Sequence, residues 1–146
     1  MLKTRLLSER AKMPCFMTKG AACADMFLPA DVTIPPMGIS KNLKDNIIKI
    51  PLDIAFDIPS GFKIVMYPRS SLLIKRGLIQ PVSIIDEDYH GNVHAPLVNI
   101  TNEPIELKAG ERLVQIELQL AMPKGICDWY TVESERDQNG FGGTGK

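Results

Sequence analysis

Strict alternation of apolar and polar side chains late in the chain restricts the fold more than any other feature. In the segment ERLVQIELQL every second residue is apolar: Val114, Ile116, Leu118 and Leu120. The residues between them are polar: Gln115, Glu117 and Gln119. Successive side chains of an extended strand point to opposite faces, so this pattern predicts a strand with one buried face.

Short segments of a similar kind recur along the chain. They are rich in β-branched or aromatic residues and are bounded by turn-forming residues: NIIKI (46–50), DIAFDI (53–58), FKIVMY (62–67), VSII (82–85) and HAPLVNI (94–100). The 11 Pro, the 11 Gly and the near absence of helical periodicity agree with many short strands. We therefore predict an all-β domain of the jelly-roll or β-barrel type.

One segment, PRSSLLIKRG (68–77), departs from the strand pattern. Ser70 or Ser71 can cap a helix and Gly77 can end it in the left-handed conformation, which predicts one short helix. Free backbone N–H groups, hydroxyls and the Arg69 guanidinium would meet at its first turn, which suits an anion. A capped connecting helix with a surface arginine is the alternative for these residues taken alone.

The C-terminal segment RDQNGFGGTGK (136–146) differs in composition from the rest. Four of its last seven residues are glycine, so it cannot build a packed core. We assign residues 1–134 to the β domain and residues 135–146 to a flexible tail. Phe141 among the glycines and Arg136 before them suit a tail that closes over a nucleotide, and a disordered tail is the alternative.

Length and charge limit the kind of partner. The 146 residues suit one domain, and 17 basic residues balance 17 acidic ones, so no overall field attracts nucleic acid or a membrane surface. A small ligand is the expected partner. Cys15, Cys23 and Cys127 form no Cys-x-x-Cys pair, which argues against a disulfide framework and a zinc site. Without a signal-like or spanning apolar run, we expect a cytoplasmic protein.

Three consecutive carboxylates follow a predicted strand. Asp86, Glu87 and Asp88 could form a solvated turn, or one of them could perform chemistry. His90 and His94 lie four residues apart but have no third ligand nearby in the sequence. We expect these histidines to be surface or interface residues and not a metal site.

Five segments resemble, in order and spacing, the five motifs of the trimeric dUTP pyrophosphatase (dUTPase) family: AACADM (21–26), PRSSLLIKRGL (68–78), IIDEDYHGNV (84–93), AGERLVQIEL (109–118) and RDQNGFGGTG (136–145). TIPP (33–36) and IPSGF (58–62) also look like family framework segments, so the resemblance covers most of the chain. It implies hydrolysis of dUTP to dUMP and pyrophosphate, which keeps uracil out of DNA. It also implies a homotrimer in which three chains contribute to each active site.

The resemblance assigns roles to individual residues. Asp86 would be the general base for the water that attacks the α-phosphorus, while Glu87 and Asp88 would be solvated turn residues. Tyr89 would pack on the deoxyribose and leave no room for a ribose hydroxyl, and Phe141 would stack on the uracil. The residues implied to bind substrate are Arg69, Ser70, Ser71, Ser83, Ile84, Ile85, Tyr89, Gln115, Arg136, Phe141, Gly142 and Thr144.

Recognition of the base and of the metal follows from the same resemblance. The backbone of a hairpin over residues 81–95 would pair with the uracil edge and would leave cytosine with unpaired groups. Family members use Mg²⁺ held mainly by triphosphate oxygens. Asp25 and Gln115 match residues that contact the metal through its water shell, which suits an ion that loses water reluctantly.

Four positions depart from the usual family pattern. Cys23, Ser71 and Ser83 stand where glycine is usual or frequent, and Gly143 replaces a common serine. The segment 37–57 looks longer than usual, which predicts a larger surface loop. Two other functions fit the same scaffold: a nucleotide-gated regulator that binds a partner protein, and a dCTP deaminase, against which the DEDY and FGGTG segments argue.

Overall fold

The computed structural model of the chain describes residues 1–38 and 42–122. Several predicted features lie outside these residues, namely Cys127 and the tail with Arg136, Phe141, Gly142, Gly143 and Thr144. Within the described part the prediction of an all-β domain with one short α-helix is confirmed.

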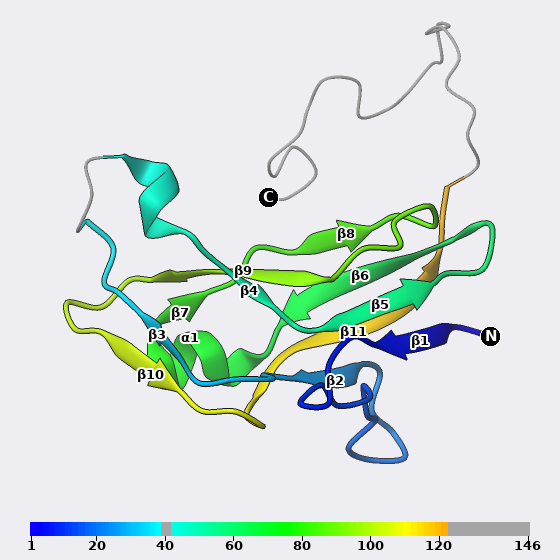
Figure 1. Ribbon diagram of the computed structural model, residues 1–146, viewed down its shortest axis with the longest axis horizontal. Coiled ribbons are helices and arrows are strands. Elements are labelled where there is room, and N and C mark those ends of the chain that lie inside the picture. The colour runs from blue at the N-terminus through cyan, green and yellow to red at the C-terminus, as the bar shows by residue number, and fades with distance from the viewer. Residues whose placement is uncertain (39–41, 123–146) are drawn as a thin grey trace, which may run out of the picture.

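The strands are short and antiparallel (Figure 1). They are β1 (Lys3–Leu6), β2 (Ala24–Phe27), β3 (Val32–Ile34), β4 (Ile48–Pro51), β5 (Ile54–Asp57), β6 (Phe62–Pro68), β7 (Leu78–Ile79), β8 (Ser83–Ile85), β9 (His94–Asn99), β10 (Ile105–Leu107) and β11 (Arg112–Leu120). They form one four-stranded sheet, β2–β11–β6–β8, one three-stranded sheet, β4–β9–β7, and the pairs β1–β5 and β3–β10. The single α-helix of the described part is α1 (Ser70–Arg76).

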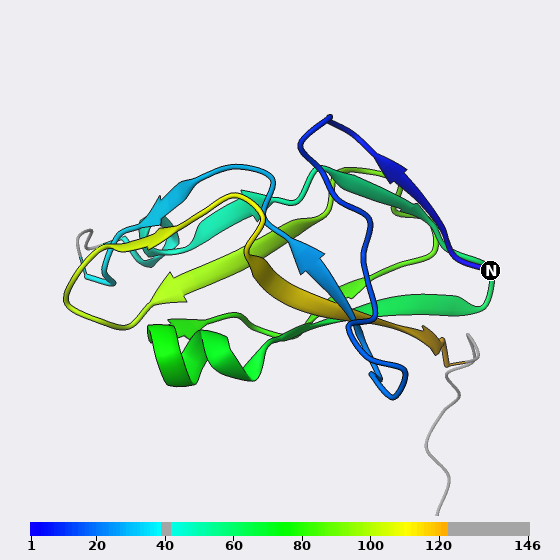
Figure 2. The same cartoon turned by 90° about the horizontal axis from the view of Figure 1, so that it is seen from below.

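One hydrophobic core joins the four sheets. The most completely buried large side chains come from strands of every sheet, among them Met26, Ile34, Ile54, Ile64 and Leu97. Each side chain of this size contributes about 1.5–3 kcal/mol when it is removed from water. The sheets therefore act as walls of a single core, and α1 lies at its edge beside β7 and contributes the buried Leu72 (Figure 2).

Strand β11 pairs with β2 on one side and with β6 on the other. Val114 and Ile116 are buried as the alternation predicts, while Gln115 lies half-buried on the opposite face. The prediction fails for Leu120, which is 74% exposed. Ala24, the first residue of β2, lies opposite Ile116, so the last residues of β11 have only β6 beside them and extend past the core.

The segment after β8 crosses between two sheets. Strand β8 pairs with β6, whereas β9 pairs with β4 and β7. The predicted hairpin over residues 81–95 is therefore wrong, because its two strands belong to different sheets. Backbone bonds fix the end of the crossing: Leu52 N–H donates to Val93 O (2.9 Å) and Val93 N–H donates to Ile54 O (2.8 Å).

Helix α1 ends as predicted, with Gly77 in the left-handed conformation at φ 64° and its N–H bonded to the carbonyl of Leu73 (3.0 Å). The predicted serine cap is wrong. Arg69 occupies the N-cap position and makes no side-chain capping bond, so the helix begins one residue earlier than a cap by Ser70 requires.

The segment 37–57 does not form the predicted large loop. It contains a 3-10 helix, η1 (Leu43–Asn46), followed by β4 and β5. The side chain of Asn46 is buried and its Oδ1 accepts the N–H of Gly38 at 3.0 Å, which ties the segment to the end of the preceding turn. The described residues of this segment are therefore largely in regular structure.

Five strands escape prediction from the sequence pattern, namely β1, β2, β3, β7 and β10. None of them is longer than four residues, and none except the three-residue β3 stands in a run of β-branched or aromatic residues such as marks the equally short β4, β5 and β8. Pairing with a distant segment defines each one, as in β3 and β10, where Thr33 lies opposite Glu106.

No helix within the described residues is long and apolar enough to cross a membrane.

Replacing Gly77 by alanine tests how the helix stop is built. A Cβ at this position would enter the side chain of Thr101, and the left-handed backbone adds its own strain. We expect Gly77→Ala to lower the free energy of unfolding in urea by about 2–4 kcal/mol. Gly38→Ala is the matched control, because Gly38 has φ 96° but a Cβ there would meet nothing within 4 Å. It should lose about 1–2 kcal/mol, and equal losses would contradict the steric account.

Candidate functional site

A first cavity, of about 410 Å³, lies beside β2, β11 and the start of α1. We call it the Asp25 cavity. It is lined by Met17, Ala21, Ala22, Cys23, Asp25, Arg69, Ser70, Arg112 and Gln115. Four of the predicted site residues thus meet here, because the register of β11 with β2 sets Gln115 opposite Asp25. Ser71 lies instead in an adjoining cavity of about 360 Å³, which shares Arg69 and Arg112 with the first.

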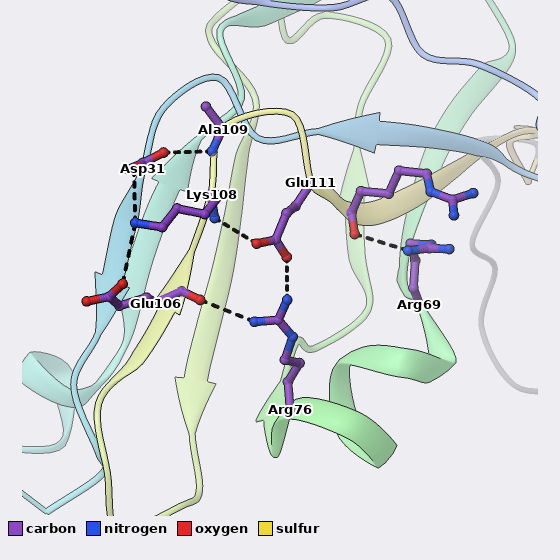
Figure 3. Close-up of polar contacts among 8 residues, drawn as sticks. Asp31, Arg69, Arg76, Glu106, Lys108, Ala109 and Glu111 are labelled. Atoms are coloured by element: carbon purple, nitrogen blue, oxygen red, sulfur yellow. Dashed lines mark hydrogen bonds and ion pairs between the residues drawn. The ribbon is translucent and has the colours of Figure 1, made fainter.

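Two arginines hold the carboxylate of Asp25, which is only 7% exposed. Arg69 Nε lies 3.2 Å from Oδ1, and Arg112 Nη1 lies 3.2 Å from Oδ2. Arg69 Nη1 also donates to the backbone carbonyl of Arg112 at 3.2 Å (Figure 3). The Arg69 guanidinium is therefore already paired with Asp25 and with the backbone of Arg112. The buried carboxylate fixes two cations in the cavity wall.

Arg112 is a candidate site residue that the sequence analysis misses. It stands at the start of β11, where one cation among alternating residues gives no recognisable pattern. Only the pairing of β11 with β2 brings its guanidinium to Asp25. Gln115 sits further along the same strand and donates from Nε2 to the carbonyl of Pro68 (3.1 Å), which leaves its Oε1 as an acceptor.

Cys23 forms part of the wall of the Asp25 cavity. Burial raises the pKa of its thiol above the ordinary value, and the charges of Glu117 and Asp25 raise it further. The thiol is therefore protonated and a weak nucleophile near neutral pH. At this position the residue acts as a small wall group.

Helix α1 is fastened to the turn between β10 and β11 (Figure 3). Arg76 Nη2 lies 2.6 Å from Glu111 Oε2, and Arg76 Nη1 donates to the carbonyl of Glu106 at 3.2 Å. Glu111 Oε1 in turn accepts the N–H of Lys108 at 2.8 Å. These contacts hold the last turn of the helix, so its first turn stays beside the Asp25 cavity.

A second cavity, of about 240 Å³, lies where the chain crosses from β8 to β9. We call it the Tyr89 cavity. It is lined by Met66, Ser83, Ile84, Ile85, Asp86, Tyr89, Val93 and His94. Five predicted site residues are brought together here, and His94 joins them at the cavity while remaining exposed, as expected of a surface residue.

The hydroxyl of Ser83 forms hydrogen bonds with neighbouring residues of its own loop. Its Oγ donates to the carbonyl of Pro81 at 3.2 Å and accepts from Nε2 of the buried Gln80 at 3.4 Å. A side chain at this glycine position is therefore held by neighbours within the loop.

Asp86 follows the last residue of β8 and its backbone carbonyl accepts the N–H of Tyr89 at 3.1 Å. Its exposed carboxylate borders the Tyr89 cavity and also a third cavity of about 650 Å³, formed with Lys63, Glu87, Asp88 and residues 60–62, 121 and 122. Asp86 is the one described residue that lines both. A ligand that spans the two spaces would meet this carboxylate.

Glu87 is not the freely solvated turn residue that the sequence analysis expects. Its Oε2 accepts the backbone N–H of Gly61 at 2.6 Å, which ties the crossing to the turn between β5 and β6. Asp88 is exposed, in agreement with a turn residue.

The Asp25 cavity and the Tyr89 cavity are spatially separate within one chain. Asp25 and Gln115 lie opposite each other on one face of the four-stranded sheet, whereas Ser83 lies opposite Met66 on the other. Strands β2 and β8 are the outer strands of this sheet, so three strand spacings, about 14 Å, separate them. One chain therefore does not bring Asp86 to Asp25.

The two histidines do not form a pair. Nδ1 of His94 lies 2.8 Å from the carbonyl of Asn92, and Nδ1 of His90 lies 3.4 Å from the carbonyl of Phe56. No group of three or more His, Cys, Asp or Glu side chains that could hold a metal occurs in residues 1–38 and 42–122.

Comparison with known proteins identifies relatives along nearly the whole chain. The sequence profile of the family described as dUTPase matches residues 9–145. The deoxyuridine 5'-triphosphate nucleotidohydrolase of Mus musculus is 36% identical over 141 residues, which covers 96% of this chain and 82% of the mouse protein. The protein of the same name from Nautilia profundicola is 34% identical over 148 residues, which covers 99% of each chain.

Solved structures agree with this result. The dUTPase of Staphylococcus bacteriophage 80alpha with dUpNHpp has a TM-score of 0.85 and 26% identity, and the match covers 100% of this chain and 99% of the phage chain. Phage dUTPases such as this one control the transfer of virulence genes. A mutant dUTPase from phage phi11 of S. aureus, which coordinates a structural Mg(II) ion, has the same fold, with a TM-score of 0.80, 23% identity and coverage of 92% of this chain and 99% of that chain.

Truncation of Glu87 tests its link to Gly61. Glu87→Ala removes the acceptor of a short, charge-assisted hydrogen bond, so we expect amide exchange at Gly61 to accelerate about tenfold, with Glu87→Gln in between. Exchange would be followed by NMR. Asp88→Ala removes the neighbouring exposed carboxylate and serves as the control. If both alanine variants leave the Gly61 amide unchanged, the bond does not hold the crossing in solution.

Proposed function

Since the chain belongs to the dUTPase family, we propose that it hydrolyses dUTP to dUMP and pyrophosphate with Asp86 as the general base, and so keeps uracil out of DNA. The observation that carries this proposal is the division of the site residues into two cavities of different chemistry. Two cations held by a carboxylate, one hydroxyl and an amide line the Asp25 cavity, whereas the Tyr89 cavity combines an aromatic ring, apolar side chains and one carboxylate. Phosphates suit the first and a nucleoside suits the second.

The triphosphate would be held by Arg69, Ser70, Ser71 and Arg112. The chain carries no net charge, so these local donors must supply the attraction. Asp25 keeps the two guanidinium groups in place before the ligand arrives. Preorganised donors of this kind stabilise charge that develops in the transition state, because they do not have to reorient during the reaction.

The nucleoside would occupy the Tyr89 cavity. The Tyr89 ring, 44% exposed, would lie against the deoxyribose, and backbone groups of Ser83, Ile84 and Ile85 with those of His94 would pair with the uracil edge. Ile84 is 57% exposed and adds an apolar surface beside these groups. A base that cannot match fixed backbone donors and acceptors leaves them unpaired, which is a strong source of discrimination.

Asp86 would take a proton from the water that attacks the α-phosphorus. Its carboxylate is exposed and borders both the Tyr89 cavity and the space beside Glu87. It can therefore reach the junction between the nucleoside and the phosphates, where the attacked phosphorus would lie. A carboxylate within hydrogen-bond reach of water is a competent general base.

The residues present fit a magnesium ion that is held mainly by the substrate. Asp25 Oδ1 and Oδ2 each face one arginine, but a carboxylate oxygen has a second lone pair, and Gln115 Oε1 is an acceptor. Both groups could accept hydrogen bonds from metal-bound water. Mg²⁺ would neutralise phosphate charge when bound, while Arg69 and Arg112 would orient the same phosphates.

A complete site would need more than one chain, as in a homotrimer. The separation of the Asp25 and Tyr89 cavities supports this, because one copy cannot offer both halves to one ligand. Exposed apolar side chains on α1, on β7 and β8 and on the segment between these two strands give a surface for association. They are Leu73 (52%), Ile74 (81%), Ile79 (43%), Val82 (59%) and Ile84 (57%). The tail residues Arg136, Phe141, Gly142 and Thr144 would close over the ligand.

Pyrophosphate release tests the reaction. With Mg²⁺ present, we expect dUTP to be hydrolysed and dCTP, dTTP and UTP to be poor substrates, with loss of activity when EDTA removes the metal. Asp86→Asn should lower kcat by about 10²–10⁴-fold with little change in dUTP binding, because it removes only the base. Asp88→Asn is the control, and truncation before Arg136 tests the tail. A wild-type chain that hydrolyses none of the four nucleotides would overturn the proposal, and ammonia release from dCTP would replace it with deamination.

Mixing two inactive variants tests the shared site. Asp86→Asn and Arg69→Ala chains, denatured together and refolded at equal amounts, should regain about a quarter of wild-type activity, because that fraction of interchain sites receives both intact halves. Each variant refolded alone is the control. If each site lies within one chain, no mixture recovers activity.

A further inference from the structure

A chain of hydrogen bonds reaches Tyr89 from residues that line neither the Asp25 cavity nor the Tyr89 cavity. Tyr89 Oη donates to the backbone carbonyl of Asn92 at 2.7 Å. Asn92 Nδ2 donates to Asp53 Oδ1 at 3.1 Å, and Ser8 Oγ donates to Asp53 Oδ2 at 2.9 Å. Two distant segments, those of Ser8 and Asp53, are thus joined through Asn92 to the residue that we place against the sugar.

The backbone of Asp53 has an unfavourable conformation at the position where its side chain makes these bonds. It is the one non-glycine residue with positive φ, 54°, in the described ranges 1–38 and 42–122. Aspartate tolerates this conformation better than most residues, but glycine would adopt it freely. What glycine lacks is the carboxylate, whose two oxygens accept from Ser8 and Asn92. The backbone carbonyl of Asp53 also accepts the N–H of Leu7 at 2.8 Å.

The amide of Asn92 is oriented by Asp53. A flipped amide would set its oxygen against the carboxylate, so Nδ2 must face Asp53. The remaining Oδ1 is buried and finds no hydrogen-bond partner in the described part of the chain. A buried acceptor without a partner is unfavourable, which indicates that the bond on the other side of the amide holds this residue in place.

The ring of Tyr89 is confined on a second side by Gly91. A Cβ at Gly91 would lie 2.8 Å from Tyr89 Oη and 2.9 Å from Cζ, so the ring is in close contact with that backbone. His94 Nδ1 shares the Asn92 carbonyl at 2.8 Å and stands at the edge of the same cavity. The open side of the ring therefore faces the cavity in one fixed position.

Resting on the proposed function, we propose that Asp53 and Asn92 are positioning residues that set the preference for deoxyribose over ribose. They do not touch the substrate. Asp53 accepts a hydrogen bond from the Asn92 side chain, and the Asn92 carbonyl accepts one from the Tyr89 hydroxyl. These bonds, on the side of the ring away from the substrate, fix the distance between the ring and the sugar C2′. Without this support the Tyr89 ring can move away from the sugar and leave space for a 2′-hydroxyl. Steric exclusion of ribose requires a ring whose position is fixed.

The test compares dUTP and UTP as substrates of the full chain with Mg²⁺. Asn92→Ala removes the link and keeps the backbone carbonyl, and we expect the ratio of kcat/KM for dUTP to that for UTP to fall about tenfold. Asp53→Asn keeps the tolerance for positive φ and one oxygen, so the ratio should fall about threefold. It also provides a second measurement if Asn92→Ala folds poorly.

Thr101→Val is the matched control for stability. It removes a hydroxyl that donates to Asn99 Oδ1 at 2.7 Å, at the far end of β9 from Asn92. We expect a lowered Tm and an unchanged dUTP to UTP ratio. If Asn92→Ala and Asp53→Asn also lower only the Tm, their role is structural and the inference is overturned.

Titration calorimetry with dUMP and UMP separates the inference from the proposed reaction. If wild type hydrolyses dUTP and the variants keep its selectivity, only the inference fails. If wild type hydrolyses no dUTP but prefers dUMP to UMP, and Asn92→Ala reduces that preference, the reaction fails and the positioning role stands. A wild-type chain that does neither overturns both.

Discussion

Residues 86–93 leave the four-stranded sheet after β8 and enter the three-stranded sheet at β9, and the path is fixed at both ends. Near its start, Glu87 accepts the N–H of Gly61, and at its end Val93 exchanges backbone bonds with Leu52 and Ile54. A crossing held in this way has little freedom, so its side chains keep their directions. Asp86 therefore borders two cavities at once, and Tyr89 closes one of them.

The Asp25 cavity depends on a different constraint, which is a carboxylate buried between two guanidinium groups. Charged pairs that are withdrawn from water contribute little net stability, since desolvation offsets much of their attraction. Their value here is geometric. Asp25 holds Arg69 and Arg112 on one wall, and the helix that carries the neighbouring serines is fastened from its other end by Arg76 and Glu111. A chain with no net charge thereby acquires a local anion site.

Local sequence predicts those features that depend on neighbours along the chain. The alternation around Val114 and Ile116 predicts a half-buried strand, and Gly77 predicts the end of the helix, because each signal lies within a few residues. Local sequence fails for the helix cap at Arg69, for the exposed Leu120 and for the bond of Glu87. The exposure of Leu120 and the bond of Glu87 depend on a strand and a turn that are distant in sequence, and the side chain of Arg69 is bonded to the distant Asp25 and Arg112.

By itself, the sequence determined the all-β class, the short helix and, through five ordered motifs, membership of the dUTPase family. Periodicity and turn chemistry are properties of short segments, and so they can be read without knowing the fold. Only the tertiary structure decided that β8 and β9 join different sheets, that Arg112 meets Asp25, and that Asp53 supports Tyr89 through Asn92. These contacts join residues far apart in the chain, and strand register and burial select them among many alternatives that the sequence leaves open.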